Sequence, residues 1–439
     1  MTPYIIISRP QNIIRNYIYD VSKINRNLKY HFSKFLITLA VPEGQLFYST
    51  LTGLLVLVKD IEKSRDFLIK ENILVNDDIN EKEIVDKIRT ICHSNAVESS
   101  TCNKYWIIVT TNCNANCFYC FEKGYKKIDM KITTAKDIAL YIKKQYKGKL
   151  INLYFTGGEP LLQKNCIDII CNILNESNIL YESTLISNGY LFSPELQKNA
   201  ITTWNLNRLI VTIDGPEQLY NNVKWSLNKN INQFNIVLSN IFNFLKYQKD
   251  IYIRVNVGDF NKSKVEELNT FLLNKFKDYP NITTYYTFLI TIDKYVFSQE
   301  NFKDLHQLIH SLRIPWKKRK NFHSYQLHGF ITGLTPELVG RYRVIKPDGI
   351  FAANPDLFND DDFGSIYTHF KINSARLNFY LKEIEKNVPI CDSCPLYPTC
   401  FRPKNIISSH ICSISEQAIC IDENKEKMNF LYSLVKKYI

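Results

Sequence analysis

The chain has 439 residues, of which 22% are charged and 45% are hydrophobic, an ordinary balance for a globular protein with a large core. No apolar run approaches the roughly eighteen residues that span a membrane, so a membrane-embedded protein is excluded by composition. The formal net charge of +12 follows from a lysine-rich composition, and a solvated lysine-rich surface explains it better than a nucleic-acid partner.

The twelve cysteines bear on the cellular compartment of the protein and on metal binding. The first ten residues contain no basic stretch ahead of an apolar one, so they do not resemble a signal peptide. In a long chain without such a signal, clustered cysteines indicate metal ligation rather than disulfides. We therefore expect a cytoplasmic protein with metal sites.

The first hundred residues are expected to form a separate small α+β module. Residues 32–41 and 45–58 are predicted as two strands joined by a turn at Pro42-Glu43-Gly44. Residues 63–71 and 81–92 are predicted as helices, because the apolar positions of the second segment share one helical face.

Three closely spaced cysteines follow an apolar run from Tyr105 to Thr110. They are Cys113, Cys117 and Cys120, with the spacing C-x3-C-x2-C. Three thiolates on one loop can hold three irons of a 4Fe–4S cluster and leave the fourth iron open for a small molecule. The alternatives are incidental thiols or an incomplete zinc knuckle, although structural zinc sites use four ligands.

A glycine-rich segment, Gly157-Gly158-Glu159-Pro160, ends the next apolar stretch. Two glycines let a backbone approach a ligand closely, and Glu159 adds an acceptor beside them. Taken alone, such a segment could be a β-turn that leads into a helix. Its place at the end of the strand after the cysteine loop makes it a much stronger signal.

Together, the C-x3-C-x2-C loop and the Gly-Gly-Glu-Pro segment resemble the radical S-adenosylmethionine (SAM) superfamily. The resemblance implies a SAM-binding 4Fe–4S cluster on the three cysteines of the loop. It also implies that the residues from Gly157 to Pro160 bind the amino group of SAM.

Strand-like and helix-like segments alternate through the middle of the chain. Strands are predicted at residues 105–110, 151–155, 182–186, 208–213, 251–257 and 283–291, and helices at 133–147, 161–176, 193–202, 233–248 and 263–277. Alternation predicts an α/β fold with parallel strands and right-handed crossovers. It matches the partial (β/α)6 barrel that the resemblance implies, in which ligands bind at the carboxyl ends of strands, where both motifs fall.

The ends of the third and fourth strands also resemble the family. Asn188 lies in a segment like its Asn-Gly turn. Thr212 stands at the position of a hydroxyl residue, and Lys224 at that of an arginine, which together contact the SAM carboxylate in sulfatase and peptide maturases. Lysine loses the bidentate fork of arginine but keeps its charge. Ordinary strand-end turn chemistry is the alternative for each segment.

A second group of cysteines lies near the C-terminus. Cys391, Cys394, Cys400 and Cys412 resemble the ligands of one auxiliary 4Fe–4S cluster in the SPASM domain of peptide-modifying radical SAM enzymes. Cys420 competes with Cys412 as the fourth ligand. A zinc site held by four cysteines is the alternative for the quartet.

The other auxiliary cluster of SPASM domains lacks its ligands in this chain. A hairpin over residues 342–353 resembles the family's hairpin, but it has Ala353 at the cysteine position, and Lys404 replaces a further cysteine. One auxiliary cluster is therefore expected. Asn354 stands where the sulfatase maturases carry an aspartate base, which argues against a formylglycine-forming reaction.

These features predict four parts of the chain: a module at 1–100, a radical SAM core at 101–295, a linker with bridging helices at 296–340 and a SPASM-like domain at 341–439. The resemblance implies an enzyme that cleaves SAM reductively, with flavodoxin or ferredoxin as reductant. Its implied substrate is a ribosomally made precursor peptide, which receives a thioether or carbon–carbon crosslink or is epimerised.

Other interpretations of the chain stay open. It could mature a protein enzyme, or it could be a degenerate, non-catalytic binding module, although the complete motifs argue against the latter. The N-terminal module could capture a leader peptide by β-augmentation or merely pack on the barrel. No catalytic side chain is assigned.

Overall fold

The structure is a computed structural model. It describes residues 2–8, 27–85, 102–120, 122–224, 232–288, 343–352, 364–368 and 394–399, with Leu308 and residues 421, 424–425, 428–429, 431–433 and 436. The chain divides into two compact units. The N-terminal unit comprises residues 1–98, 314–335 and 378–439, and the barrel unit comprises residues 99–313 and 336–377. The boundaries of the four parts drawn from the sequence stay predictions.

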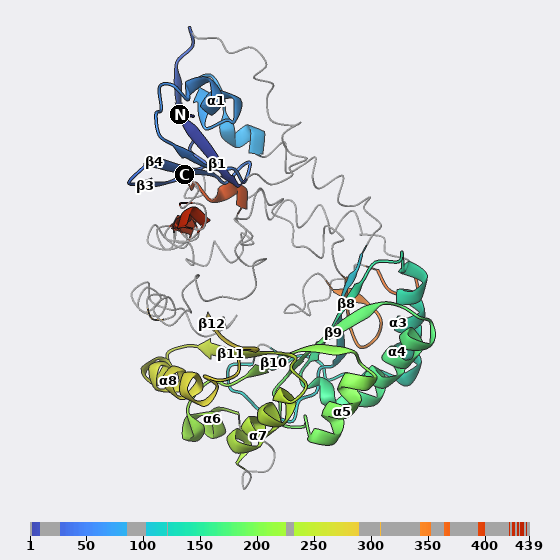
Figure 1. The fold of residues 1–439 in the computed structure, drawn as a ribbon. Helices are drawn as coiled ribbons and strands as arrows, with labels where there is room; N and C mark the ends of the chain where they lie inside the picture. The colour runs from blue at the N-terminus through green and yellow to red at the C-terminus, as the bar shows by residue number, and fades with distance from the viewer. Residues whose placement is uncertain are drawn as a thin grey trace. The chain divides into compact units, whose positions relative to one another are not determined.

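The N-terminal unit contains a four-stranded antiparallel sheet. Its order is β1 (Tyr4–Ser8), β5 (Leu55–Val58), β4 (Gly44–Ser49) and β3 (Leu36–Val41). A second ladder pairs β2 (Tyr30–Phe32) with β6 (Leu74–Asn76), and α1 spans Arg65–Lys70 (Figure 1).

The single strand expected over residues 45–58 is wrong. This stretch folds back on itself as β4 and β5, with the Ser49 amide donating to the Leu54 carbonyl at 2.9 Å. Gly53 adopts a φ of +72°, which favours glycine, at the turn between them. The apolar pattern hides this turn because Leu51 and Leu54 are buried although they lie outside the strands.

Both faces of this sheet are covered. Alternate residues of β4 and β5 point to opposite faces, as a strand's period of two requires. One face packs with Leu68 and Ile69 of α1. The other packs with Met428 and Tyr432, from the far end of the chain. Residues near the C-terminus therefore complete the core of the unit that holds the first hundred residues.

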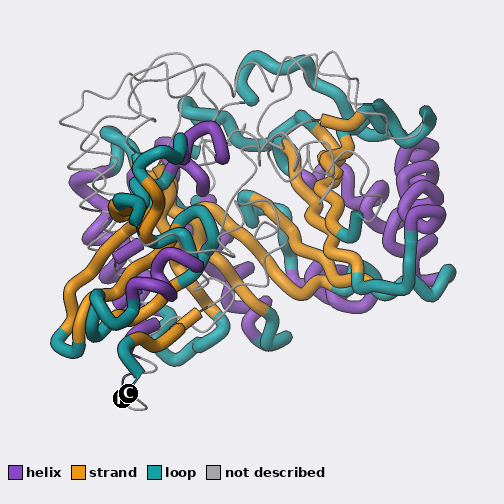
Figure 2. The backbone as a smooth tube through the Cα atoms, turned by 90° about the horizontal axis from the view of Figure 1, so that it is seen from above, coloured by secondary structure: helices purple, strands orange, loops and turns teal. Residues whose placement is uncertain are grey.

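The barrel unit confirms the predicted α/β fold. Its parallel strands are β7 (Lys104–Thr110), β8 (Ile151–Gly157), β9 (Tyr181–Ser187), β10 (Leu206–Thr212), β11 (Asp250–Val257) and β12 (Ile282–Phe288). They pair in chain order, and among the described residues β7 and β12 do not pair with each other, so the barrel is partial. Figure 2 distinguishes the strands from the helices by colour.

Helices of the barrel unit follow the strands, five of them as predicted, while the short helix over residues 217–223 was not predicted. They are α3 (Ile132–Gln145), α4 (Lys164–Glu176), α5 (Pro194–Thr202), α6 (Glu217–Val223), α7 (Gln233–Leu245) and α8 (Val265–Lys275). They lie along the outer side of the sheet (Figure 1). Each buries one apolar stripe: in α3, Ala135, Ile138, Ala139 and Ile142 are buried, at the spacing of one helical face. None of the described helices is both long and apolar enough to cross a membrane.

The predicted hairpin extends this sheet. β13 (Arg343–Ile345) pairs antiparallel with β14 (Phe351–Ala352) and parallel with β7. Val344 and Ala352 pack against Ile108 of β7. Ala353 and Asn354 lie outside the described residues.

Candidate functional site

The cysteine loop leaves the carboxyl end of β7 and is closed at its base. The Thr111 amide donates to the Ile128 carbonyl at 2.9 Å, and the Ile128 amide donates to Thr111 Oγ1 at 2.7 Å. Cys113, Cys117 and Cys120 lie on this closed loop, and all three are partly buried. The predicted ligands are therefore held on one short segment at the carboxyl edge of the sheet.

The free thiols are held in their protonated form. Burial raises the pKa of Cys113 to about 12, and the nearby Glu159 carboxylate acts in the same direction. Burial also raises the pKa of Cys117 and of Cys120. A bound metal must displace these protons, because the thiolate is the ligand.

The chemistry of the three thiols is that of an iron–sulfur ligand set. Among the described residues, no three His, Cys, Asp or Glu side chains are arranged to hold one metal ion. A 4Fe–4S cluster makes a different demand, since each thiolate binds a different iron. The structure places three partly buried thiols on one loop, which is the donor set such a cluster uses.

The two glycines of the second motif contact the cysteine loop. The Gly158 amide donates to the Thr110 carbonyl at 3.0 Å, and the Glu159 amide donates to the Asn112 carbonyl at 2.8 Å. A Cβ added to Gly157, whose φ is +134°, would lie 2.1 Å from the Thr110 oxygen. One added to Gly158 would lie 2.3 Å from the Asn112 oxygen. The sequence predicted that these glycines let a ligand approach. In the structure their missing side chains let the backbone of the cysteine loop pack directly against them.

Glu159 joins the ends of β8 and β9. Its side chain is fully buried, with Oε1 accepting from the Ser187 hydroxyl at 2.8 Å and Oε2 from the Asn188 amide at 2.8 Å. Burial raises the pKa of this carboxyl, and the hydrogen bonds oppose the rise. Pro160, also buried, begins the 3-10 helix η2 (Pro160–Gln163). Whether this segment binds the SAM amino group stays a proposal.

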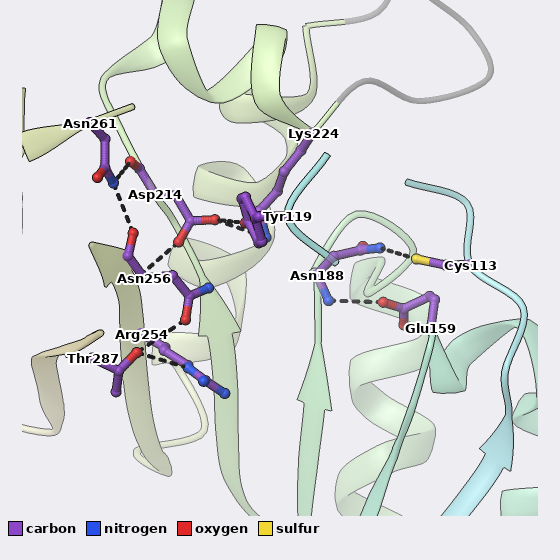
Figure 3. A network of polar contacts seen from close by, with 10 residues as sticks. All are labelled: Cys113, Tyr119, Glu159, Asn188, Asp214, Lys224, Arg254, Asn256, Asn261 and Thr287. Atoms are coloured by element: carbon purple, nitrogen blue, oxygen red, sulfur yellow. Dashed lines mark hydrogen bonds and ion pairs between the residues drawn. The ribbon is translucent and has the colours of Figure 1, made fainter. Parts of the chain in front are cut away.

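Asn188 lies against the cysteine loop (Figure 3). Its Nδ2 donates to Asn114 Oδ1 at 2.7 Å and lies 3.9 Å from Cys113 Sγ. The end of β9 is thereby tied to the first cysteine of the loop.

Asp214 is a site residue that sequence reasoning missed. It follows β10, is 1% exposed, and its Oδ1 accepts from the Asn256 amide at 2.8 Å. Its Oδ2 accepts from the Tyr119 hydroxyl and lies 3.5 Å from Lys224 Nζ (Figure 3). The only signal in the sequence was an acidic residue at a strand end, ahead of a lysine.

A small pocket with an enclosed volume of about 10 Å³ lies beside the cysteine loop and opens into solvent-accessible space. It is lined by residues of the loop, of the turn after β9 and of α6 and α7: Asn114, Ala115, Asn188, Tyr190, Tyr220, Lys224 and Gln233. Of the predicted SAM contacts, Asn188 and Lys224 line it. Thr212 is half-buried on β10, where it pairs with Arg254, and is not part of the lining.

Lys224 gives this pocket a positive charge. The side chain is buried, and burial alone would lower its pKa, but the neighbouring Asp214 carboxylate opposes this, and the pKa is raised. The ammonium therefore stays protonated and can attract an anionic group in the pocket.

The structure leaves the C-terminal cysteine site untested. Cys394 is 8% exposed and packs in an apolar cluster of the N-terminal unit with Phe35 and Tyr397. The other predicted ligands, Cys391, Cys400 and Cys412, and the competing Cys420 lie outside the described residues. The auxiliary cluster stays a prediction.

Comparison with known proteins identifies the barrel. Residues 107–272 match the family model of the radical SAM superfamily, so the chain contains a radical SAM domain. A probable GTP 3′,8-cyclase of Methanococcus aeolicus is 34% identical over 109 residues, which are 25% of this chain and 36% of that protein. The GTP 3′,8-cyclase of Alkaliphilus metalliredigens is 34% identical over 110 residues, or 25% and 33%. The chain thus spans about a third of the length of these curated relatives.

Solved structures of similar fold cover far more of the chain. Native anSMEcpe with bound AdoMet has a TM-score of 0.56 at 16% identity, over 76% of this chain and 99% of that chain. Streptococcus suis SuiB has a TM-score of 0.52 at 12% identity, over 86% and 96%. At these identities the likeness shows the fold alone.

Proposed function

We propose that the chain is a radical SAM enzyme that modifies a ribosomally made precursor peptide. When bound, a 4Fe–4S cluster supplies the electron that cleaves SAM and so releases a radical able to take hydrogen from an unreactive carbon. The observation that carries the proposal is the direct hydrogen bonding of Gly158 and Glu159 to the base of the cysteine loop, beside a pocket with a buried cation.

The chain's own residues divide the work of binding. Cys113, Cys117 and Cys120 hold the cluster, and the pocket next to them holds SAM. Lys224 offers a charged ammonium to the SAM carboxylate as a point charge, without the fork of an arginine. Asn188 is the second pocket residue that contacts SAM, and Thr212, which lies outside the pocket lining, is a contact only by its resemblance to the family. Flavodoxin or ferredoxin supplies the electron.

The fold neighbours support a peptide substrate. One structure of anSMEcpe, with a TM-score of 0.57, contains bound AdoMet and the Kp18Cys peptide. SuiB shares the same fold. The product is a thioether or carbon–carbon crosslink, or an epimerised residue. A maturase of a protein enzyme is the second candidate, favoured by the likeness to anSMEcpe. The match to the GTP cyclases covers only about a third of those proteins, so it does not carry their nucleotide substrate to this chain.

Iron content tests the cluster assignment. If Cys391, Cys394, Cys400 and Cys412 hold one auxiliary cluster, anaerobically reconstituted protein should contain about eight irons per chain, since each cluster holds four. Metal analysis with a protein-concentration standard measures this. About twelve irons would reveal a further cluster, and about four irons with one zinc would favour the structural zinc site.

The edge of the N-terminal sheet is the proposed site for a leader peptide. Among the described residues, β3 pairs only with β4, and its Thr38 and Ala40 are exposed. Val41 pairs with Gly44 at the turn, and hydrogen-bonded and non-hydrogen-bonded pairs alternate along an antiparallel ladder. The Ala40 amide therefore faces the free edge, where an extended peptide can add a strand.

Replacing Ala40 by proline is expected to weaken precursor binding about tenfold, because it removes one edge donor, a change that edge strands tolerate. The affinity is measured by titration calorimetry with a synthetic copy of a precursor peptide whose gene lies next to the gene for this protein. Ala40→Ser, which keeps the amide, is the matched control. Peptide-free SAM cleavage should be unchanged, because the SAM motifs lie in the barrel unit.

If Ala40→Pro and the parent protein bind the precursor peptide with equal affinity, this edge does not bind the leader peptide. Point substitution is preferable to deleting residues 1–100, because deletion would strip the sheet that Met428 and Tyr432 pack against.

A further inference from the structure

Asp214 is anchored rigidly at the end of the barrel sheet. Its Oδ1 accepts from the Asn256 amide of β11 at 2.8 Å, and its main-chain carbonyl accepts from Asn261 Nδ2 at 2.7 Å. Asn261 is fully buried and also donates to the Asn256 carbonyl at 2.8 Å. The carboxylate therefore has little freedom to follow a moving partner (Figure 3).

The other oxygen of this carboxylate touches two different structures. Oδ2 accepts from the hydroxyl of Tyr119, which lies between the second and third cysteines of the loop. The same oxygen lies 3.5 Å from Nζ of Lys224, which lines the pocket. Tyr119 also stacks on Phe260, with ring centroids 5.5 Å apart, so both its ring and its hydroxyl are held.

The three groups depend on one another. The side chains of Lys224 and Asp214 are 6% and 0% exposed, and a buried charge that loses its partner is strongly destabilised. A ligand anion that attracts Lys224 weakens the ion pair between Lys224 and Oδ2. The hydroxyl of Tyr119 then becomes the main donor to Oδ2, and that hydrogen bond strengthens. A change on either side of Asp214 is thus felt on the other.

We propose that Asp214 is a positioning residue that couples the cation of the SAM pocket to the cysteine loop through Tyr119. The inference rests on the proposed function, because it names SAM as the ligand of the pocket. By thermodynamic reciprocity, SAM binding changes how firmly the loop is held, and the state of the loop changes SAM affinity.

A purely structural Asp214 makes a different prediction. If it only ties β10 to β11 through the Asn256 amide, asparagine can replace it, since the amide oxygen still accepts that bond. If it acts through charge on Tyr119 and Lys224, asparagine fails.

A double-mutant cycle tests the coupling. Asp214→Asn, Tyr119→Phe and the double variant are prepared with reconstituted clusters. SAM dissociation constants are measured by calorimetry without reductant, and the electron paramagnetic resonance of the dithionite-reduced protein is recorded with and without SAM. Each single variant should weaken SAM binding about tenfold, and the double variant should be no weaker than Asp214→Asn alone, because coupled residues are not additive. The spectral change on adding SAM should be altered in Tyr119→Phe.

Matched controls remove similar hydrogen bonds elsewhere in the barrel unit. Asp168 accepts from Asn199 and from Trp204, each at 2.7 Å, and the Tyr286 hydroxyl donates to Asn269. Asp168→Asn and Tyr286→Phe should lower the melting temperature without changing SAM affinity. Lys224→Arg, which keeps the charge, should retain the non-additivity.

Independent effects that multiply to about a hundredfold in the double variant, or unchanged SAM affinity in Asp214→Asn, would overturn the coupling. If the parent protein does not bind SAM at all, the proposed function fails. The same cycle on melting temperatures, without SAM, then decides whether Asp214 and Tyr119 are coupled.

Discussion

Changing Cys113, Cys117 and Cys120 to alanine together is expected to abolish reductive SAM cleavage. No other described side chain replaces them, because thiolates are the ligands that bind the irons of such a cluster. Anaerobically reconstituted protein would be incubated with SAM and dithionite, and 5′-deoxyadenosine quantified by chromatography. Iron per chain should fall by about four, the content of one such cluster, and the proposed auxiliary cluster should be retained.

The control for this variant is the same change at two buried cysteines. Cys166 and Cys171 are buried residues of α4 and belong to neither motif. Cys166→Ala/Cys171→Ala should lose some stability through the cavities created but keep its iron and its SAM cleavage. Cleavage at the parent level in the triple variant would disprove the cluster assignment.

Gly158→Ala is expected to have the second largest effect. The added Cβ would lie 2.3 Å from the Asn112 carbonyl oxygen and 2.7 Å from its carbon, and a backbone cannot swing aside as a side chain can. Either the cysteine loop or the Gly-Gly-Glu segment must move, so we expect a loss of about 3 kcal/mol in the free energy of unfolding. Bound iron should fall with it, and SAM affinity should drop at least about tenfold.

Gly148→Ala is the control that introduces backbone strain without a steric clash. Gly148 has a φ of +76° and open space around its Cβ position, so alanine there costs strain of about 1–2 kcal/mol without touching the site. Denaturant unfolding, iron analysis and SAM calorimetry on both variants give the comparison. Parent-level iron and SAM affinity in Gly158→Ala would show that the contact with Asn112 does not hold the loop.

The N-terminal unit shows where local patterns mislead. Residues 45–58 carry one continuous apolar pattern, yet they form two strands of a hairpin. The pattern records burial, and the turn between the strands is buried as well. The contacts of Met428 and Tyr432 with this sheet join residues hundreds of positions apart, which no local periodicity encodes.

The sequence by itself determined the alternating strands and helices, the cysteine loop after β7 and the Gly-Gly-Glu-Pro segment after β8. Each of these depends on residues close together in the chain, where periodicity and glycine placement act directly. Only the tertiary structure decided that Gly158 admits the Asn112 backbone, and that Asp214 joins Tyr119 to Lys224. Tyr119 and Asp214 are 95 residues apart, and they meet because parallel strands bring their carboxyl ends to one edge. Such contacts arise from strand order and register, which the chain specifies only once the whole sheet has formed.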